Sequence, residues 1–490
     1  MLPGVLPLNR SDRLIATVAV MVATAMQAAD ATIANVALPQ LEYDLGGGIE
    51  LGAWVMTSYL CANALVAPLT GWLRRRFGAR RLFVGGVGVF VAASLLCSLA
   101  PTPAVIILAR IVQGAGGGVV HPLAQAILLD LYPRQQHGRM LGIWGAMIMV
   151  GPILGPALGG IITDLASWRW VFVINLPLGA LVIWGIWRVL PKTALVDDLS
   201  IDVVGIALLA IAIAALQLSL ARGVARSWVH SPELLAETAI AAVAFIAIAV
   251  RVHRGRFRVF RTDLFRDINF ATATFYNFMT SALLFVVIVF VPALGEGPLR
   301  YGATLAGFTL VPRGILMMLT MLLVGQFFGK IDFRILLIGG MWLMAAGLWM
   351  LGAVQPISAV SGIVIGSALQ AVGGGMLFTS LSTLAFATLA PDMRTDAAGV
   401  YSLSRQLGYA SGVALMTAVL GAQVDANLVY LAAPAFAALS PPLTDSANLL
   451  AYSTCFRAMA VTALIMIPGF WLFRPGSLSG PIHDAGHDPG

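Results

Sequence analysis

The sequence predicts an all-α polytopic membrane protein whose chain crosses the bilayer fourteen times. Of its 490 residues, 59% are hydrophobic and only 10% are charged, whereas about a quarter of the residues of a soluble domain are charged. Apolar segments of bilayer-spanning length, about 20 residues each, recur along the whole chain. Because backbone groups in lipid must be hydrogen-bonded within the segment itself, these segments are predicted to be helices.

The fourteen predicted spans form groups of six, two and six. The first six lie near residues 14–38, 51–72, 82–99, 104–128, 140–162 and 170–188. A pair near 203–220 and 234–250 follows, and then six near 268–294, 303–327, 335–353, 359–388, 398–420 and 455–473. Two six-helix halves with a substrate site between them are typical of rocking transporters.

The expected domains follow from this grouping. They are an N-terminal six-helix bundle (1–190), a linker with two additional transmembrane helices (191–266), a C-terminal six-helix bundle (267–474) and a cytoplasmic tail (475–490).

The net charge of +7 is distributed unevenly across the predicted membrane. Twenty-one of the 29 Lys and Arg residues fall on one side, many of them in segments 74–81 and 251–266. The opposite side holds only Arg169, Arg222, Arg226 and Arg300. This asymmetry predicts that both termini are cytoplasmic. The basic segments are therefore interpreted as topology anchors in contact with the lipid bilayer, not as a nucleic-acid surface.

The fifth span contains a glycine pattern, GAMIMVGPILGPALGG, over residues 145–160. Three of its glycines recur every four residues and so line one helix face: Gly151, Gly155 and Gly159. Small residues at this spacing let two membrane helices approach closely. Pro152 and Pro156 remove backbone donors from the same helix, which favours a bend.

Charged side chains inside a membrane are costly and indicate function. Asp30 is the only acid well inside a predicted span, and four arginines accompany it: Arg110, Arg313, Arg405 and, near an outer end, Arg457. Asp30 and Arg110 both lie about 10–14 Å below the outer surface, so they can meet at one depth. Two interpretations stay open. In the first, Asp30 and Arg110 are a proton-coupling pair. In the second, Asp30 is structural, either in a fixed ion pair with Arg110 or hydrogen-bonded to Thr32 and Asn35.

Several motifs together resemble one transporter family. Residues 30–39 read DATIANVALP, 110–118 read RIVQGAGGG and 168–177 read WRWVFVINLP. With the glycine motif, these segments make the chain similar to the fourteen-span drug:proton antiporters of the major facilitator superfamily, and most closely to the EmrB/QacA group. The resemblance implies the major facilitator fold and efflux of drug-like compounds by alternating access, driven by protons. It also implies a role for Arg110 in proton transfer.

The same resemblance implies a setting in the bacterial cytoplasmic (inner) membrane. Related pumps commonly work with a periplasmic adaptor protein and an outer-membrane channel. The longest external segment, 423–454, is a candidate docking surface for such a partner or a purely structural loop.

The loop after the second span departs from the superfamily pattern. The usual Gly-x-Leu-x-Asp-Arg-x-Gly reads GWLRRRFG here, and Arg75 stands at the Asp position. The candidate residues of a cytoplasmic gate are Gly71, Arg75, Gly78 and Arg80. The pairing that closes the gate in the family cannot be carried over to an arginine.

Polar residues in the predicted pore-facing spans are candidates for the substrate cavity. They are Thr32, Asn35, Gln113, His121, Gln370, Arg405 and Gln406. With one deep acid against several buried arginines, the composition favours neutral, amphipathic or weakly acidic compounds over dications.

Other functional classes fit the sequence less well. The alternatives are an efflux or uptake carrier for a specific metabolite, and a membrane-embedded enzyme built on His121 and Asp130. Those two residues are about 13 Å apart along one helix, too far to act together, so no enzyme is expected. The three cysteines have no metal-ligand spacing, and no lysine completes a phosphate-binding loop. Neither a metal nor a cofactor is expected.

Overall fold

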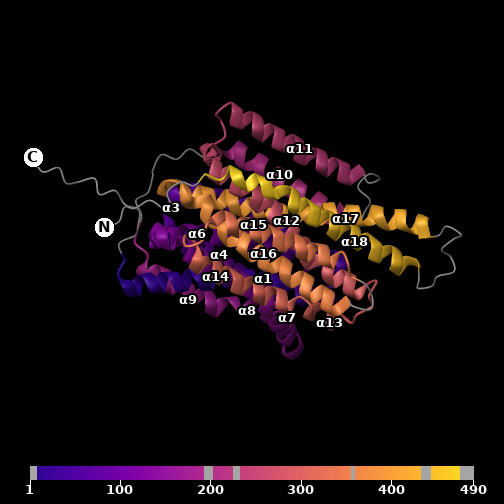
Figure 1. Ribbon diagram of the computed structural model, residues 1–490. Helices are drawn as coiled ribbons and strands as arrows, with labels where there is room; N and C mark the ends of the chain where they lie inside the picture. Colours follow the sequence, from indigo (N-terminus) through magenta and orange to yellow (C-terminus); the bar gives the residue numbers. More distant parts are fainter. Residues whose placement is uncertain (1–7, 193–201, 224–231, 355–358, 432–442, 475–490) are drawn as a thin grey trace, which may run out of the picture.

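A computed structural model describes residues 8–192, 202–223, 232–354, 359–431 and 443–474. The regular elements of these residues are all helices (Figure 1). The predicted cytoplasmic tail and most of the segment between the first bundle and the added pair lie outside the described residues.

The first group of helices is called the N-terminal half here. Its α-helices are α1 (Arg10–Leu45), α2 (Gly48–Val66), α3 (Thr70–Phe77), α4 (Ala79–Ser98), α5 (Pro103–Gly118), α6 (Val120–Leu131), α7 (His137–Leu165), α8 (Trp170–Val173) and α9 (Asn175–Val189). Short 3₁₀ turns, η1 (Ala67–Leu69) and η2 (Arg134–Gln136), join α2 to α3 and lead into α7. Asn9 caps α1 by accepting a hydrogen bond from the Asp12 N–H.

The second group is a helical hairpin of α10 (Val203–Gly223) and α11 (Pro232–His253), followed by η3 (Thr262–Arg266). Leu209 and Ile213 of α10 pack with Ala64 of α2 and Leu403 of α17. The inserted hairpin therefore contacts both halves of the molecule.

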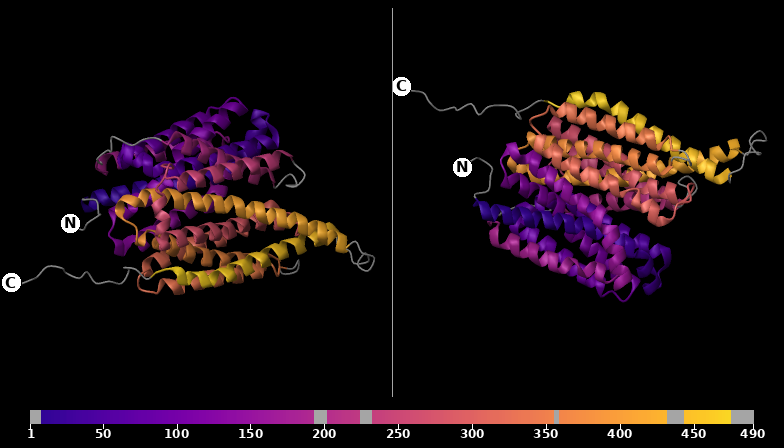
Figure 2. Two further views of the ribbon diagram at one scale, coloured as in Figure 1. Left: turned by 90° about the horizontal axis from the view of Figure 1, so that it is seen from above. Right: turned by 60° about the horizontal axis from the view of Figure 1, so that its bottom comes forward.

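The third group is called the C-terminal half. It comprises α12 (Ile268–Glu296), α13 (Ala303–Phe308), α14 (Val311–Phe327), α15 (Phe333–Leu351), α16 (Ala359–Ala387), η5 (Pro391–Met393), α17 (Arg394–Leu431), α18 (Leu443–Met466) and η6 (Ile467–Leu472). Figure 2 shows the indigo-to-purple helices of the N-terminal half lying beside the orange-to-yellow helices of the C-terminal half.

Thirteen helical segments among the described residues are long and apolar enough to cross a bilayer, so the protein is a multi-pass membrane protein. The remaining predicted span, near 203–220, corresponds to α10, whose apolar part is the shorter Val203–Ser219. The fourth predicted span is divided, because α5 ends at Gly118 and α6 begins at Val120. Three consecutive glycines before the break weaken helix propagation there.

The described parts of the expected external loop over 423–454 are helical. α17 continues to Leu431 and α18 already begins at Leu443. The two helices extend beyond their neighbours as a hairpin (Figure 1). Helix persists here because the two antiparallel segments pack on each other, for example through the hydrogen bond from Asn427 of α17 to the Ala447 carbonyl of α18.

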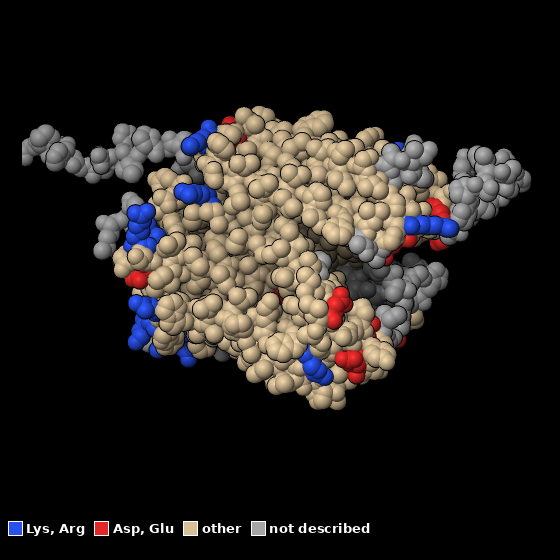
Figure 3. Space-filling view, turned by 90° about the horizontal axis from the view of Figure 1, so that it is seen from below, with Lys and Arg blue, Asp and Glu red and all other residues tan. Residues whose placement is uncertain are grey.

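The two halves touch closely where α7 packs on α14. A Cβ atom at Gly142 would lie 2.5 Å from the Met321 carbonyl oxygen, and one at Gly325 would lie 2.9 Å from the Gly138 carbonyl oxygen. Only glycine permits backbones this close. The contact lies toward the end of the molecule where α3 ends and α4 begins, which we call the basic end. Figure 3 shows most exposed basic side chains at that end and a hollow toward the opposite end.

Candidate functional site

Asp30 lies inside the N-terminal half, on α1, and is 1% exposed. Its carboxylate accepts hydrogen bonds from Arg110 of α5 at 2.8 Å, from Gln113 of α5 at 2.9 Å and from Asn175 of α9 at 2.7 Å. The structure thus brings Asp30 and Arg110 together, in agreement with the equal membrane depth predicted for them from the sequence. Three donors surround one buried acid, which is the arrangement that a charged carboxylate needs in an apolar interior.

The guanidinium of Arg110 is fully buried and has further partners. It donates to the Gln113 side-chain oxygen at 2.7 Å and to the Val55 carbonyl at 3.3 Å. Its carbon lies 4.2 Å from the ring centroid of Tyr59. Ser94 of α4 completes the network by accepting from both Gln113 and Asn175. We call Asp30, Arg110, Gln113, Asn175 and Ser94 the acid network.

Ser94 and Asn175 were not singled out as site residues from the sequence. Both are polar residues inside predicted apolar spans, and this was the available signal. The alternative partners considered for Asp30 do not bond it. The Thr32 hydroxyl donates to the Gly151 carbonyl at 2.9 Å, and Asn35 is exposed.

The glycine face of α7 packs on α1, the helix that carries Asp30. A Cβ atom at Gly151 would strike the Ala28 backbone, and one at Gly155 would strike the Thr32 hydroxyl. Gly159 faces Ile33 and Val36 of α1. The helix runs without interruption through Pro152 and Pro156. The predicted glycine face therefore packs within the N-terminal half, whereas Gly142 of the same helix faces the other half.

Ion pairs join the two halves at the basic end. Arg75 of α3 pairs with Asp396 of α17, and Arg74 donates to Asp130 of α6 and to the Thr395 hydroxyl, both at 2.6 Å. Arg394 of α17 reaches the same Asp130 at 3.3 Å and also donates to the Leu129 carbonyl. These residues tie α3 and α6 of one half to α17 of the other.

The candidate gate residues occupy three different surroundings. Gly71 is pressed against the Asp396 carboxylate, so a side chain there would displace the acid that pairs with Arg75. Gly78 ends α3 with a φ of 78° that favours glycine. Arg80 lies over the Trp187 ring of α9, at 4.3 Å from its centroid, within the N-terminal half. The partner of Arg75, Asp396 in the segment PDMRTD, is not predicted from the sequence.

A more exposed ion pair lies next to this network. Arg261 donates to Asp392 at 2.7 Å and to Asp263 at 2.9 Å. The hydrogen bond from Arg261 lowers the pKa of Asp263 below its usual value, although burial opposes the shift. All three side chains are well exposed, so these contacts contribute little to stability.

The candidate cavity residues do not form one group. Gln113 belongs to the acid network. Gln370 accepts from Arg313 of α14 at 3.2 Å and donates to the Leu283 carbonyl, all within the C-terminal half. Gln406 is half-buried. His121 and Arg405, in contrast, come from opposite halves and approach the same tryptophan.

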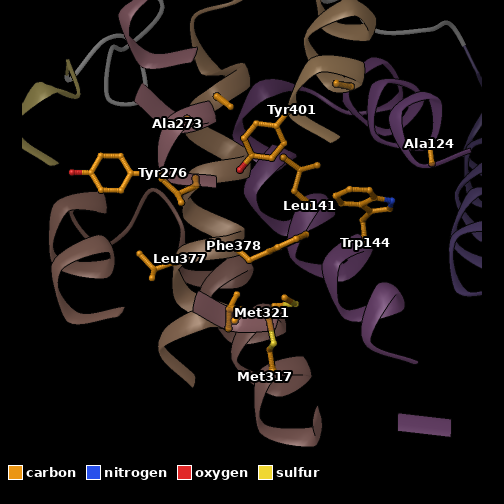
Figure 4. Packing of buried hydrophobic residues seen from close by; sticks show 14 of the residues in the cluster. Ala124, Leu141, Trp144, Ala273, Tyr276, Met317, Met321, Leu377, Phe378 and Tyr401 are labelled. Atoms are coloured by element: carbon orange, nitrogen blue, oxygen red, sulfur yellow. The ribbon is translucent and has the colours of Figure 1, made fainter. Parts of the chain in front are cut away.

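That tryptophan is Trp144 of α7, which is fully buried between the halves. Its ring lies 6.1 Å from that of His121 and 6.0 Å from that of Phe378 of α16, measured between centroids. The Arg405 guanidinium carbon lies 5.8 Å from the Trp144 ring. Figure 4 shows Phe378 extending from the other half toward α7, where Trp144 lies beside it.

Comparison with known proteins identifies the family. The sequence model of the Major Facilitator Superfamily matches residues 20–413. The chain belongs to this superfamily. The multidrug export protein EmrB of Haemophilus influenzae is 33% identical, over 84% of this chain and 81% of that protein. EmrB of Escherichia coli K12 is 32% identical over the same shares.

A solved relative supports the fold alone. The structure of the proton:xylose symporter XylE bound to 6-bromo-6-deoxy-D-glucose superposes with a TM-score of 0.61 at 17% identity, covering 94% of this chain and 96% of that one. The major facilitator fold of this protein is therefore established. The acid network, the glycine faces and the aromatic contact at Trp144 all lie within the residues that match the superfamily.

Proposed function

We propose that this protein is a proton-coupled multidrug efflux transporter, a carrier that exports amphipathic or weakly acidic compounds by alternating access. Superfamily membership and the similarity to multidrug export proteins support the efflux function. The observation that carries the proton-coupling part is the acid network, in which Asp30 is an intramembrane acid with three removable donors.

Asp30 is the proposed proton carrier and Arg110 its regulator. In the present arrangement the cation and two amide groups stabilise the charged carboxylate. A conformational change that withdraws Arg110 would leave a charge in an apolar interior, which is costly, so the carboxylate would take up a proton. Restoring the contact would release that proton.

The two glycine surfaces of α7 suggest how this event is transmitted. Gly151, Gly155 and Gly159 hold α7 against α1, which carries Asp30, while Gly142 holds α7 against α14 of the other half. A shift of α1 would therefore move the helix that closes the basic end. This route consists of packing contacts between helices. The variants Gly155→Leu and Gly142→Ala test whether it couples Asp30 to the basic end.

The proposed gate at the basic end uses Arg75 and Asp396, with Arg74, Asp130 and Arg394 beside them. The family's acid at position 75 is replaced by a base, and the acid is supplied by α17 instead. These pairs would break when the basic end opens and re-form when it closes.

The proposed setting is the bacterial inner membrane, with the basic end and both termini in the cytoplasm. The distribution of basic residues supports this orientation. In this orientation the α17–α18 hairpin would project on the periplasmic side, where it is a candidate contact for a periplasmic adaptor protein working with an outer-membrane channel.

The test is a tolerance screen in efflux-deficient bacteria exposed to a panel of amphipathic weak acids and neutral drugs. Expression of the protein should raise tolerance to at least one compound, and an uncoupler should abolish its efflux from energised cells. Asp30→Asn should remove the protection at unchanged expression. The control is Asp392→Asn, which removes an exposed acid. Protection that survives in Asp30→Asn would refute the assigned coupling residue.

A further inference from the structure

Arg405 of α17 is a buried cation with incomplete pairing. It is 6% exposed, and its only hydrogen bond among the described residues is a long one of 3.4 Å to the Ser402 hydroxyl. Its Nη1 atom is buried and has no hydrogen-bond partner within the described part of the chain. No ion pair of those residues includes it. A buried charge without a counter-ion is costly unless something supplies one.

The other fully membrane-embedded arginines are already satisfied. Arg110 pairs with Asp30. Arg313 donates to the Gln370 side-chain oxygen and, at 2.9 Å, to the Leu284 carbonyl. Arg405 instead lies against two aromatic rings, with its guanidinium carbon 5.8 Å from the Trp144 centroid and 5.7 Å from that of Phe378. The rings attract the cation weakly and leave its hydrogen-bond donors free.

The N-terminal half contributes unpartnered polar atoms on α6, the helix that carries His121. The His121 Nδ1 and Gln125 Nε2 atoms are buried and have no hydrogen-bond partner among the described residues. His121 and Gln125 are four residues apart on α6 and so share a face. The His121 ring meets Trp144 edge-on, and the Arg405 guanidinium lies over the same tryptophan. His121 and Arg405, each with an unpartnered polar atom, thus approach Trp144 from opposite halves, and Gln125 shares the helix face of His121.

We propose that Arg405 binds the anionic group of an amphipathic monoanion, a carboxylate attached to an aromatic body, whose ring packs against Trp144 and Phe378. This assignment rests on the proposed function, because it names the substrate class and the receptor residue of that transporter. A planar guanidinium suits a carboxylate, which can accept two parallel hydrogen bonds from it. Indole and phenyl rings suit an aromatic body.

The location between the halves gives the binding a mechanical consequence. Trp144 is fully buried and Phe378 nearly so, and their rings meet across the interface. The ligand therefore enters when the halves separate, and it replaces the direct contact of the two rings. An anion bound to Arg405 and to His121 or Gln125 bridges the two halves, so its binding favours the arrangement in which both sides contact it.

The experiment measures equilibrium binding of tritiated 1-naphthylacetate to the purified full chain in nanodiscs, with no proton gradient. Saturable binding is expected for the wild type. Arg405→Gln should weaken it by about tenfold to hundredfold, as expected for a lost charge-assisted hydrogen bond. Arg405→Lys should retain part of the affinity. The matched control is Arg457→Gln, which removes an exposed arginine that lies over Trp349 in the same half.

A second measurement needs no variant. The uncharged 1-naphthylacetamide has nearly the same shape, and it should compete with 1-naphthylacetate at least tenfold less well than the unlabelled acid does. Equal competition by the amide would overturn the assignment. So would an Arg405→Gln affinity within threefold of wild type, or the absence of saturable binding to the wild type.

Binding in Asp30→Asn separates this inference from the proposed function. If proton coupling is wrongly assigned, Asp30→Asn still transports in the tolerance screen. If the anion site is wrongly assigned, binding fails the Arg405 tests whatever the outcome at Asp30. If Asp30→Asn retains binding of 1-naphthylacetate but loses transport, the result supports both the proton-coupling role of Asp30 and the anion site at Arg405.

Discussion

Replacing Gly142 by alanine is expected to hold the basic end of the transporter open. Gly142 lies on α7 where it meets α14 of the other half. The added methyl group would lie 2.5 Å from the Met321 carbonyl oxygen and 3.0 Å from the Gly325 Cα atom. Because both neighbours are backbone atoms, neither can move aside by a change of rotamer. The halves must separate locally or the methyl group cannot be accommodated.

The size of the effect follows from these distances. Ordinary van der Waals contact begins at about 3.4 Å, so the two backbones must separate by about 1 Å. Overpacking of this kind costs about 1–3 kcal/mol. Since every 1.4 kcal/mol is a factor of ten, the ratio of closed to open molecules should fall by roughly fivefold to 150-fold.

The assay is the distance between two spin labels across the basic end. One label replaces Phe77, which is 47% exposed at the end of α3, and the other replaces Lys330, which is exposed after α14. The native cysteines are first replaced: Cys61, Cys97 and Cys455. Gly142→Ala should enlarge the population with a long distance.

The control is Gly160→Ala on the same helix. A Cβ atom there has nothing within 4 Å, so the same chemical change should leave the distance distribution unaltered. An unchanged distribution in Gly142→Ala, with normal expression and thermal stability, would refute the interpretation of α7 and α14 as the closing contact. A shift of the distance distribution in both Gly142→Ala and Gly160→Ala would mean that alanine in α7 causes it wherever it is placed. That result would equally refute the interpretation of the α7–α14 contact.

Three further outcomes are expected. Gly155→Leu should disrupt the packing of α7 on α1 and abolish transport while the protein still inserts; normal transport would remove the physical basis of the glycine face. Arg75→Glu should repel Asp396, increase the long-distance population of the spin-label pair and slow transport, whereas the same charge change at the exposed Arg81 should not. Asp202 is bonded to the Arg251 side chain and to two backbone N–H groups, and although burial opposes this, these bonds lower the pKa of its carboxyl. A carboxyl whose pKa is lower in the folded protein stabilises it at any pH above the pKa of the unfolded chain, and this stabilisation is lost as the pH falls through the pKa of the folded protein. Asp202→Asn should therefore lower the melting temperature at pH 7, and the difference in melting temperature from wild type should be smaller below pH 4.

Periodicity and apolar length predicted the helices, because lipid leaves a spanning segment almost no other structure. The division of the fourth span at Val119 and the helical extension of α17 to Leu431 were not predicted. Both depend on which neighbouring helix packs beside the segment, and hydropathy does not report this.

Equal depth along two helices predicted that Asp30 and Arg110 can meet. It could not predict the bonds from Gln113 and Asn175, because depth does not specify the rotation of a helix about its axis. The same limit explains why Gln113 and Gln370, assigned to the cavity from their polarity, lie inside single halves.

The sequence by itself determined the membrane class, the family and the chemistry available at each depth, since these depend on composition and on local patterns. Tertiary structure alone decided the partners. It placed Asp396 opposite Arg75, set one glycine surface of α7 toward α1 and another toward α14, and left Arg405 between two aromatic rings without an acid among the described residues. Those contacts join residues up to 321 positions apart, and only the packing of whole helices brings such positions together.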